Sequence, residues 1–286
     1  MAYPGFTLTG FADEIDSDLE TQLSVLESLD IEHIEVRSVG AQNVLDLDDD
    51  EIESVKAELD SRGFTVSSIG SPIGKVDVTD PFEPHLERFE RAMDVAERFE
   101  TKYIRLFSYY IPEGEDPADY RDEVLHRMRR KAELVEERGL VLLNENEKDL
   151  YGDTPGRMRD IHLAVDSPNL RMVFDPANYL ELGIRPYPDA LLQVVEFVEY
   201  LHVKDAKLGV RGEMRPAGEG DGRIPETLEA LAARGFEGYL SLEPHLQVAG
   251  EAGGFSDEEG FRTATRALTD VLESVDEEPP AAVSED

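Results

Sequence analysis

The 286-residue sequence predicts an α/β protein, a (β/α)8 TIM barrel in which a parallel eight-stranded barrel is surrounded by outer helices. Two observations support this fold class. Short apolar runs rich in β-branched and aromatic residues recur about every 25–40 residues, the length of one strand–helix unit. Most of these runs are followed by a segment whose apolar residues have helical spacing. Regular alternation of strands and helices favours a parallel sheet, and a closed barrel is the economical form at this length.

Eight runs are predicted as strands because their apolar residues are continuous or alternate with polar ones. In chain order they are Thr7–Ala12, Ile31–Arg37, Phe64–Ile69, Tyr103–Tyr109, Leu140–Asn144, Leu170–Phe174, Val198–Val203 and Tyr239–Leu242.

The segments between the strands carry helix signals. Leu19, Leu23 and Leu26 fall at i, i+4 and i+7, which places them on one helix face. Thr154 is a predicted N-cap for the helix that begins at the next residue. Several predicted helices begin near a proline, whose missing N–H does no harm in a first turn. These prolines are Pro84, Pro155, Pro188 and Pro225.

No linker divides the chain, so residues 1–273 are predicted to form a single catalytic domain. Residues 274–286 are acidic, contain two prolines and lack apolar spacing, which predicts a disordered tail. An open, doubly wound sheet is the alternative fold. It usually has a glycine-rich phosphate loop after the first strand, and Gly10–Glu14 lacks the second glycine of that loop.

The charge balance excludes several classes of function. The chain has 28 Lys+Arg against 64 Asp+Glu, a formal net charge of −36. Nucleic acids and anionic membranes are recognised by basic residues, so neither is expected as a partner. There are no cysteines, and no apolar stretch approaches the length of a membrane span. The N-terminal residues lack the pattern of a signal peptide, so a soluble, cytoplasmic protein is predicted.

The basic residues comprise only 7 lysines beside 21 arginines. Acidic, lysine-poor surfaces are typical of proteins from a high-salt cytoplasm, where solvated carboxylates maintain solubility and salt screens their repulsion. The sequence therefore predicts a halophilic, salt-adapted protein, and an ordinary acidic protein is the alternative.

Four successive predicted strands end in a candidate metal ligand. These residues are Glu145, Asp175, His202 and Glu243. Side chains of a strand alternate between its two faces, and in the last three predicted strands the apolar neighbours occupy the face toward the helices. In the fifth predicted strand, Val141, Leu143, Glu145 and Glu147 share one face. All four candidates are therefore expected to point into one mouth of the barrel, where the active sites of such barrels lie.

Three carboxylates and one imidazole close together would repel each other unless a cation joins them. Oxygen-rich ligation with one imidazole suits Mn²⁺, Mg²⁺, Co²⁺ or Zn²⁺, so one divalent metal ion is predicted. The alternative is that each carboxylate is a loop charge or a partner for an arginine inside the barrel.

Further polar residues are predicted to bind substrate at the same mouth. Arg105 is either such a residue or an interior partner for a carboxylate such as Glu35. The loop Gly218–Arg223 either binds a phosphate or simply forms a turn, and its acidic residues favour the turn. The predicted substrate-binding residues are Asn178, Lys204, Arg105, Glu147, Arg185 and His245.

The strand ends resemble those of the xylose isomerase-like TIM-barrel family of sugar (phosphate) isomerases and epimerases. The motifs that carry the resemblance are Gly10–Ile15, Asn144–Lys148, Tyr151–Pro155, Phe174–Asn178, His202–Asp205 and Ser241–His245. The resemblance implies that Glu145, Asp175, His202 and Glu243 hold a single metal and that the two glutamates form the acid/base pair. Many members have a histidine three residues after the metal aspartate, and here that residue is Asn178.

The function implied is a metal-dependent isomerase or epimerase of a keto-sugar or sugar phosphate. One glutamate removes a proton next to a carbonyl, the metal stabilises the resulting enediolate, and the other glutamate returns the proton. Two alternatives remain open: an inosose-type dehydratase that uses the same site, and a metal-containing barrel that binds a small ligand without turnover. A trinuclear apurinic endonuclease is disfavoured by the net charge and the missing histidines. The family resemblance also allows a homo-oligomer.

Overall fold

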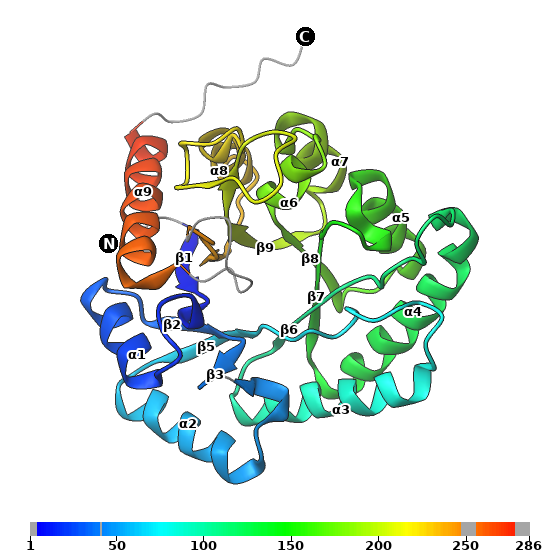
Figure 1. The fold of residues 1–286 in the computed structure, drawn as a ribbon, viewed down its shortest axis with the longest axis horizontal. Coiled ribbons are helices and arrows are strands. Elements are labelled where there is room, and N and C mark those ends of the chain that lie inside the picture. The colour runs from blue at the N-terminus through cyan, green and yellow to red at the C-terminus, as the bar shows by residue number, and fades with distance from the viewer. Residues whose placement is uncertain (1–4, 41, 247–255, 278–286) are drawn as a thin grey trace.

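The strands form one parallel sheet that curves into a nearly closed barrel with helices around it (Figure 1). The structure is a computed structural model that describes residues 5–40, 42–246 and 256–277. Its eight-stranded sheet has the order β1-β12-β9-β8-β7-β6-β5-β2. The strands are β1 Phe6–Gly10, β2 His33–Val36, β5 Thr65–Ile69, β6 Tyr103–Leu106, β7 Val141–Glu145, β8 Leu170–Phe174, β9 Val198–Val203 and β12 Gly238–Leu242.

The predicted fold class and all eight predicted strands are confirmed. A parallel bridge between Phe11 and Glu35 joins the ends of β1 and β2, which brings the two edges of the sheet together. The open, doubly wound alternative is thereby excluded, because its edge strands would not meet. Two short hairpins lie outside the barrel, formed by β3 Ser38–Val39 with β4 Gln42–Asn43 and by β10 Asp205–Ala206 with β11 Met214–Arg215.

Helices follow the strands and cover the outside of the barrel (Figure 1). The α-helices are α1 Leu19–Ser28, α2 Asp49–Ser61, α3 Phe82–Arg98, α4 Arg121–Arg138, α5 Pro155–Val165, α6 Pro176–Glu181, α7 Leu191–Val194, α8 Ile224–Ala232 and α9 Asp257–Glu277. Short 3-10 segments occur at Ala12–Glu14, Val44–Asp46, Pro117–Tyr120 and Tyr151–Asp153, and a π-helical segment at Pro186–Ala190.

The predicted helix starts are largely as expected. The Thr154 hydroxyl accepts a hydrogen bond from the Arg157 amide, so Thr154 is the N-cap of α5. Pro84, Pro155 and Pro225 lie in the first turns of α3, α5 and α8. Pro188 is different, because it lies inside the π-helical segment and α7 begins only at Leu191.

The barrel interior is apolar at one end and polar at the other. Tyr103, Leu143, Val173 and Tyr200 form a separate buried cluster inside the barrel. A polar layer follows toward the carboxyl ends of the strands, where Ser241 and other polar side chains are buried. The main core lies between the sheet and the helices, so the barrel is a packed scaffold that presents polar groups at one mouth.

The chain ends bear on two predictions. Helix α9 continues to Glu277, so residues 274–277 of the predicted tail are helical, and residues 278–286 lie outside the described residues. The single catalytic domain over residues 1–273 stays a prediction. Among the described residues, no helix has the length and apolar character required to span a bilayer.

Candidate metal centre and active site

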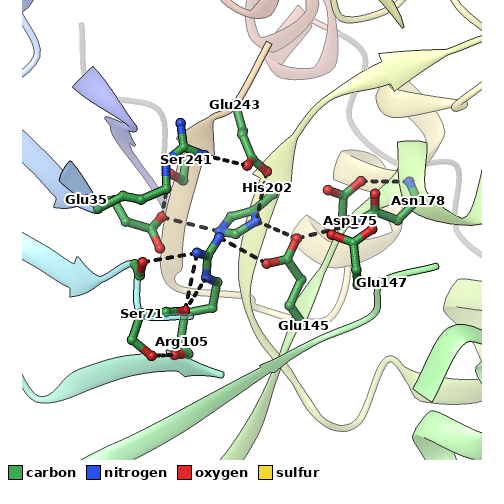
Figure 2. Close-up of polar contacts among 12 residues, drawn as sticks. Glu35, Ser71, Arg105, Glu145, Glu147, Asp175, Asn178, His202, Ser241 and Glu243 are labelled. Carbon is green, nitrogen blue, oxygen red and sulfur yellow. Dashed lines mark hydrogen bonds and ion pairs between the residues drawn. The ribbon is translucent and has the colours of Figure 1, made fainter. Parts of the chain in front are cut away.

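Four polar side chains from neighbouring strands meet at one mouth of the barrel (Figure 2). Glu145 ends β7, Asp175 follows β8, His202 lies in β9 and Glu243 follows β12. Each is buried, and one ligand atom of each lies within 4.8 Å of the others. The predicted convergence of these side chains is therefore confirmed. It arises because parallel strands place their carboxyl ends at the same edge and alternate positions face the interior.

His202 lies at the centre of this group, with carboxylates on both sides of its ring (Figure 2). Its Nδ1 atom is 3.1 Å from Glu145 Oε1 and 3.4 Å from Glu243 Oε2. Its Nε2 atom is 3.3 Å from Glu35 Oε2. Neither ring nitrogen makes a hydrogen bond of good geometry with the described residues. Burial lowers the pKa of His202, but the Glu145 and Glu35 carboxylates outweigh it and hold that pKa well above its usual value, so without a metal the imidazole carries a proton on both nitrogens. A metal bound at Nδ1 would replace the proton there and leave the other proton on Nε2, facing Glu35.

Glu35 is held in place by two hydroxyl groups. The Tyr200 hydroxyl donates to Glu35 Oε2 at 2.9 Å, and the Ser241 hydroxyl donates to the same oxygen at 2.7 Å. These contacts direct the carboxylate at His202, which makes Glu35 an outer partner of a candidate ligand. The sequence placed Glu35 inside the barrel but did not connect it with His202. Glu35 lies in β2, and alternation along that strand could have indicated that its side chain points into the barrel toward His202.

Two predicted cationic residues contact the carboxylates directly. Lys204 Nζ lies 2.9 Å from Asp175 Oδ2 and 3.0 Å from Glu243 Oε2. Arg105 Nη1 lies 3.3 Å from Glu145 Oε2. The suggested pairing of Arg105 with Glu35 is therefore not the one formed. Arg105 also donates from Nη2 to the carbonyl of Gly70, so its guanidinium is held by backbone as well as by charge.

These contacts set the protonation of the carboxylates. Burial opposes ionisation of Glu145, but His202 and Arg105 outweigh it and lower its pKa to about 2. Burial likewise opposes ionisation of Glu243, yet Lys204 and His245 hold its pKa well below the usual value. Burial raises the pKa of Asp175 to about 6 against the opposing effect of Lys204. The two glutamates are therefore ionised and able to accept a proton.

The four residues fit a divalent cation. They offer three carboxylate oxygens and one imidazole nitrogen, a donor set suited to Mn²⁺, Mg²⁺, Co²⁺ or Zn²⁺. Of the donor atoms, His202 Nδ1 is buried and makes no hydrogen bond of good geometry with the described residues, whereas Asp175 Oδ2 has its ion pair with Lys204. A buried nitrogen of this kind is costly unless a ligand satisfies it. The roles of these residues as metal ligands stay a prediction.

A cavity of about 260 Å³ opens beside the four residues. Asn178, at the start of α6, donates from Nδ2 to Glu145 Oε1 at 3.3 Å and to the carbonyl of Asn146 at 2.9 Å. Glu147 Oε2 lies 3.2 Å from Lys75 Nζ, so these two side chains form an ion pair. Predicted substrate-binding residues that line the cavity are Asn178, Lys204, Arg105, Glu147 and His245.

Arg185 is the exception among the predicted substrate-binding residues. It is exposed at the start of the π-helical segment and does not line this cavity, so its contact with substrate stays a prediction.

A second acidic group borders the cavity and includes residues that sequence reasoning missed. Glu14, Glu243 and His245 offer ligand atoms close together. However, Arg37 reaches into this group, with Nη2 at 3.1 Å from Glu14 Oε1 and Nη1 at 3.0 Å from Glu243 Oε1. The guanidinium, which also pairs with Asp13, gives these carboxylates a positive partner without a metal. Arg37 follows β2 two residues after Glu35, so strand alternation could have indicated its inward direction.

The glycine-rich loop after β9 forms a turn around a buried aspartate. The Asp205 carboxylate accepts hydrogen bonds from the backbone amides of Gly218, Gly220 and Gly222 at 3.0, 3.0 and 2.8 Å. These amides are therefore occupied by a group of the protein itself. Of the two alternatives for Gly218–Arg223, the structure supports the turn.

The sequence and the fold match known proteins. The model of the xylose isomerase-like TIM barrel family matches residues 23–271. A 3-dehydroshikimate dehydratase from Bacillus anthracis is 25% identical over 177 residues, and the match covers 61% of this chain and 61% of the length of that dehydratase.

Two solved structures of similar fold cover nearly the whole chain. A D-tagatose 3-epimerase-like protein has a TM-score of 0.78 at 18% identity, covering 95% of this chain and 98% of its own. The IOLI protein with a bound zinc atom has a TM-score of 0.76 at 15% identity, covering 94% of this chain and 99% of its own. With the family model matched over most of its length, the chain belongs to the xylose isomerase-like TIM barrel family.

Proposed function

We propose that this protein is a divalent-metal-dependent isomerase or epimerase of a keto-sugar or sugar phosphate. One observation carries the proposal. Two buried glutamates from different strands, Glu145 and Glu243, approach the same nitrogen of His202, at 3.1 and 3.4 Å. A substrate beside these residues would have one ionised carboxylate near each side of the carbon that exchanges its proton.

The two glutamates have complementary tasks. One accepts the proton from the carbon next to the substrate carbonyl and later releases it to solvent. The other, once it has taken up a proton from solvent, donates that proton to the neighbouring carbon or to the opposite face of the same carbon. A bound divalent metal would supply positive charge for the substrate oxygens as negative charge develops on them. Arg105 holds Glu145 and Lys204 holds Glu243, so each carboxylate keeps its position and its charge between turnovers.

The metal would be held by Glu145, Asp175, His202 and Glu243, with Glu35 orienting the imidazole. Asn178, Lys204, Arg105, Glu147 and His245 would bind the substrate from the walls of the cavity, and Arg185 from farther out. The substrate proposed is a small molecule with a carbonyl and adjacent hydroxyl groups, because most of the side chains that line the cavity of about 260 Å³ are polar or charged.

The test is proton exchange with solvent. The metal content of the purified protein is measured first, and a panel of keto-sugars and sugar phosphates is then incubated with it in deuterated buffer at high salt. We expect deuterium incorporation next to the carbonyl by the unchanged protein, and a loss of at least about 100-fold in Glu145→Gln and Glu243→Gln, since general acid–base catalysis contributes about 10²–10⁴-fold. Glu199→Gln, at a half-buried carboxylate of β9, is the matched control.

A second candidate is a dehydratase that uses the same two carboxylates. The observation that favours it is the similarity to the dehydratase of Bacillus anthracis. Here one glutamate removes the proton next to the carbonyl, and the carbon–oxygen bond at the following carbon breaks. The glutamate that took up the proton, or the other one after receiving it, passes that proton to the leaving hydroxide to give water and an unsaturated ketone. Ultraviolet absorbance of the conjugated product distinguishes this outcome from isomerisation.

The third alternative, a non-catalytic barrel with a structural metal, makes a different prediction. In that case Glu243→Gln would lower metal content and thermal stability, while the unchanged protein would incorporate no deuterium into any carbonyl substrate. That result would contradict both proposed reactions.

A further inference from the structure

A group of buried polar side chains outside the candidate active site lies between α3, α4 and the loop after β6. We call His85, Tyr109, Arg127 and Lys131 the basic cluster. Tyr109 and Lys131 are 0% exposed, Arg127 is 4% exposed and His85 is 7% exposed. The proposed reaction uses none of them, so their burial calls for a separate explanation.

The basic cluster is arranged around one aromatic ring. Lys131 Nζ lies 4.6 Å from the centre of the Tyr109 ring, and Arg127 Cζ lies 5.3 Å from it. The His85 ring centre is 5.5 Å from that of Tyr109. Lys131 and Arg127 are one turn apart on α4 and therefore share a face. Two cations, an imidazole and a phenol thus occupy one buried space.

Each member of the basic cluster has a polar atom without a partner. Lys131 Nζ, Arg127 Nη1, Tyr109 Oη and His85 Nε2 are buried and make no hydrogen bond with any described residue. Buried polar groups are normally satisfied, and a buried charge without a counter-charge is costlier still. Four such atoms in one place indicate a missing acceptor rather than four separate defects.

The charges that face the basic cluster are mainly positive. Besides Arg127 and Lys131, Arg88 of α3 acts on His85. The nearby carboxylates interact with Arg127 and not with Lys131. Glu123 Oε1 is 2.6 Å from Arg127 Nε, and the positive charge of Arg127 helps to lower the pKa of Asp77.

No described carboxylate forms an ion pair with Lys131, although the chain has 64 acidic residues. Burial, and then the charge of Arg127, lower the pKa of Lys131 to about 7. Burial also lowers the pKa of His85, to about 3. Arg127 has Glu123 as its counter-charge, so it is the Lys131 ammonium, protonated below about pH 7, that the described residues leave without one.

We propose that the basic cluster binds a small monovalent anion of the halide class, with chloride as the ligand in solution. Lys131 balances its charge, and Arg127 Nη1, the Tyr109 hydroxyl and His85 Nε2–H donate hydrogen bonds to it. A water molecule would accept the same hydrogen bonds but would leave the Lys131 ammonium without a counter-charge. Phosphate carries nearly two negative charges at neutral pH, more than one unpaired ammonium balances.

The first test compares salts of equal ionic strength. Thermal unfolding is measured in potassium chloride and in potassium methanesulfonate, whose anion is bulkier. We expect a higher midpoint in chloride, rising with chloride concentration, because a ligand that binds only the folded state stabilises it. In Lys131→Met, which keeps the apolar stem of the side chain, the difference between the salts should vanish.

The pH dependence gives an independent readout. Without an anion, Lys131 has a folded-state pKa of about 7, below its ordinary value of 10.5. The unfolded chain then binds a proton that the folded protein lacks, so stability rises from pH 7 toward pH 10.5. Chloride keeps the ammonium protonated and flattens this rise. The contribution of Lys131 to this pH dependence is obtained by subtracting the stability of Lys131→Met from that of the unchanged protein at each pH.

Lys102→Met is the matched control. Lys102 Nζ lies 4.5 Å from the Tyr103 ring centre, much as Lys131 lies over Tyr109, but its side chain is 59% exposed. This variant should keep the full chloride effect. A crystal grown in bromide should show an anomalous peak beside Lys131 Nζ. Equal midpoints in both salts, or a water molecule at that place in the bromide crystal, would overturn the proposal.

Discussion

At the residue scale, Glu35 shows how one outer carboxylate organises the candidate metal centre. Two hydroxyls, from Tyr200 and Ser241, hold Glu35 Oε2, which lies 3.3 Å from His202 Nε2. If a metal replaced the proton on Nδ1, between Glu145 and Glu243, the remaining imidazole proton would lie on Nε2 and face Glu35. Partners of this kind fix the tautomer and the orientation of a metal-binding histidine.

We therefore expect Glu35→Gln to weaken metal binding by about 10- to 100-fold, since outer partners of ligating histidines have effects of this size. The amide has a single oxygen and cannot hold the imidazole proton as strongly as the carboxylate. Titration calorimetry with Mn²⁺ measures the affinity. Glu199→Gln removes a carboxylate that accepts a hydrogen bond from Tyr103 and should leave the affinity unchanged. Equal affinities of Glu35→Gln and the unchanged protein would contradict this role.

At the element scale, the loop between β9 and α8 depends on its glycines. A Cβ atom on Gly220 would lie 2.1 Å from Asp205 Oδ1 and 2.6 Å from the carbonyl oxygen of Ala206. Real Cβ atoms do not approach so closely, so the loop closes around Asp205 only because no side chain is present there. The carboxylate in turn ties the loop to the start of β10.

Gly220→Ala should therefore lower the free energy of unfolding by about 1–3 kcal/mol, the range of overpacking substitutions. Urea denaturation followed by circular dichroism measures this change. Gly156→Ala is the control, because a Cβ atom on Gly156 meets nothing within 4 Å and helix α5 favours alanine. That variant should be neutral or slightly stabilising. The explanation fails if the two substitutions have the same effect.

At the scale of the whole molecule, the surface combines a large negative charge with arginine pairs between neighbouring helices. Arg62 lies 2.6 Å from Glu27 of α1, Arg98 lies 2.6 Å from Asp49 of α2, and Arg138 lies 2.6 Å from Asp94 of α3. Exposed pairs contribute only about 0–1 kcal/mol each. The excess of 36 negative charges remains after all pairing, so repulsion dominates the electrostatics of the surface.

We expect the melting temperature to rise between about 10 mM and 1 M potassium methanesulfonate, because the Debye length falls from about 30 to about 3 Å. This salt excludes any contribution from a chloride site, and Lys131→Met should show the same rise. A fall in melting temperature would mean that the arginine pairs outweigh the repulsion. The halophilic origin, the cytoplasmic location and the homo-oligomer stay predictions.

The sequence by itself determined the fold class, the eight strands and the four residues at the candidate metal centre. It did so because the direction of a side chain in a strand is a local property. Alternation along β9 and into the residue that follows it is enough to turn His202 and Lys204 inward, and the end of a parallel strand defines the mouth at which Glu243 lies.

Only the tertiary structure decided which charged groups pair. Arg105 contacts Glu145 rather than Glu35, and Arg37 reaches Glu243 across 206 residues of sequence. The choice between a phosphate loop and a turn at Gly218–Arg223 likewise depended on Asp205. Partner choice follows from distances between segments that are remote in the chain, and no local pattern encodes those distances. The physical reason is that electrostatic pairing is a property of the closed barrel and not of its separate strands.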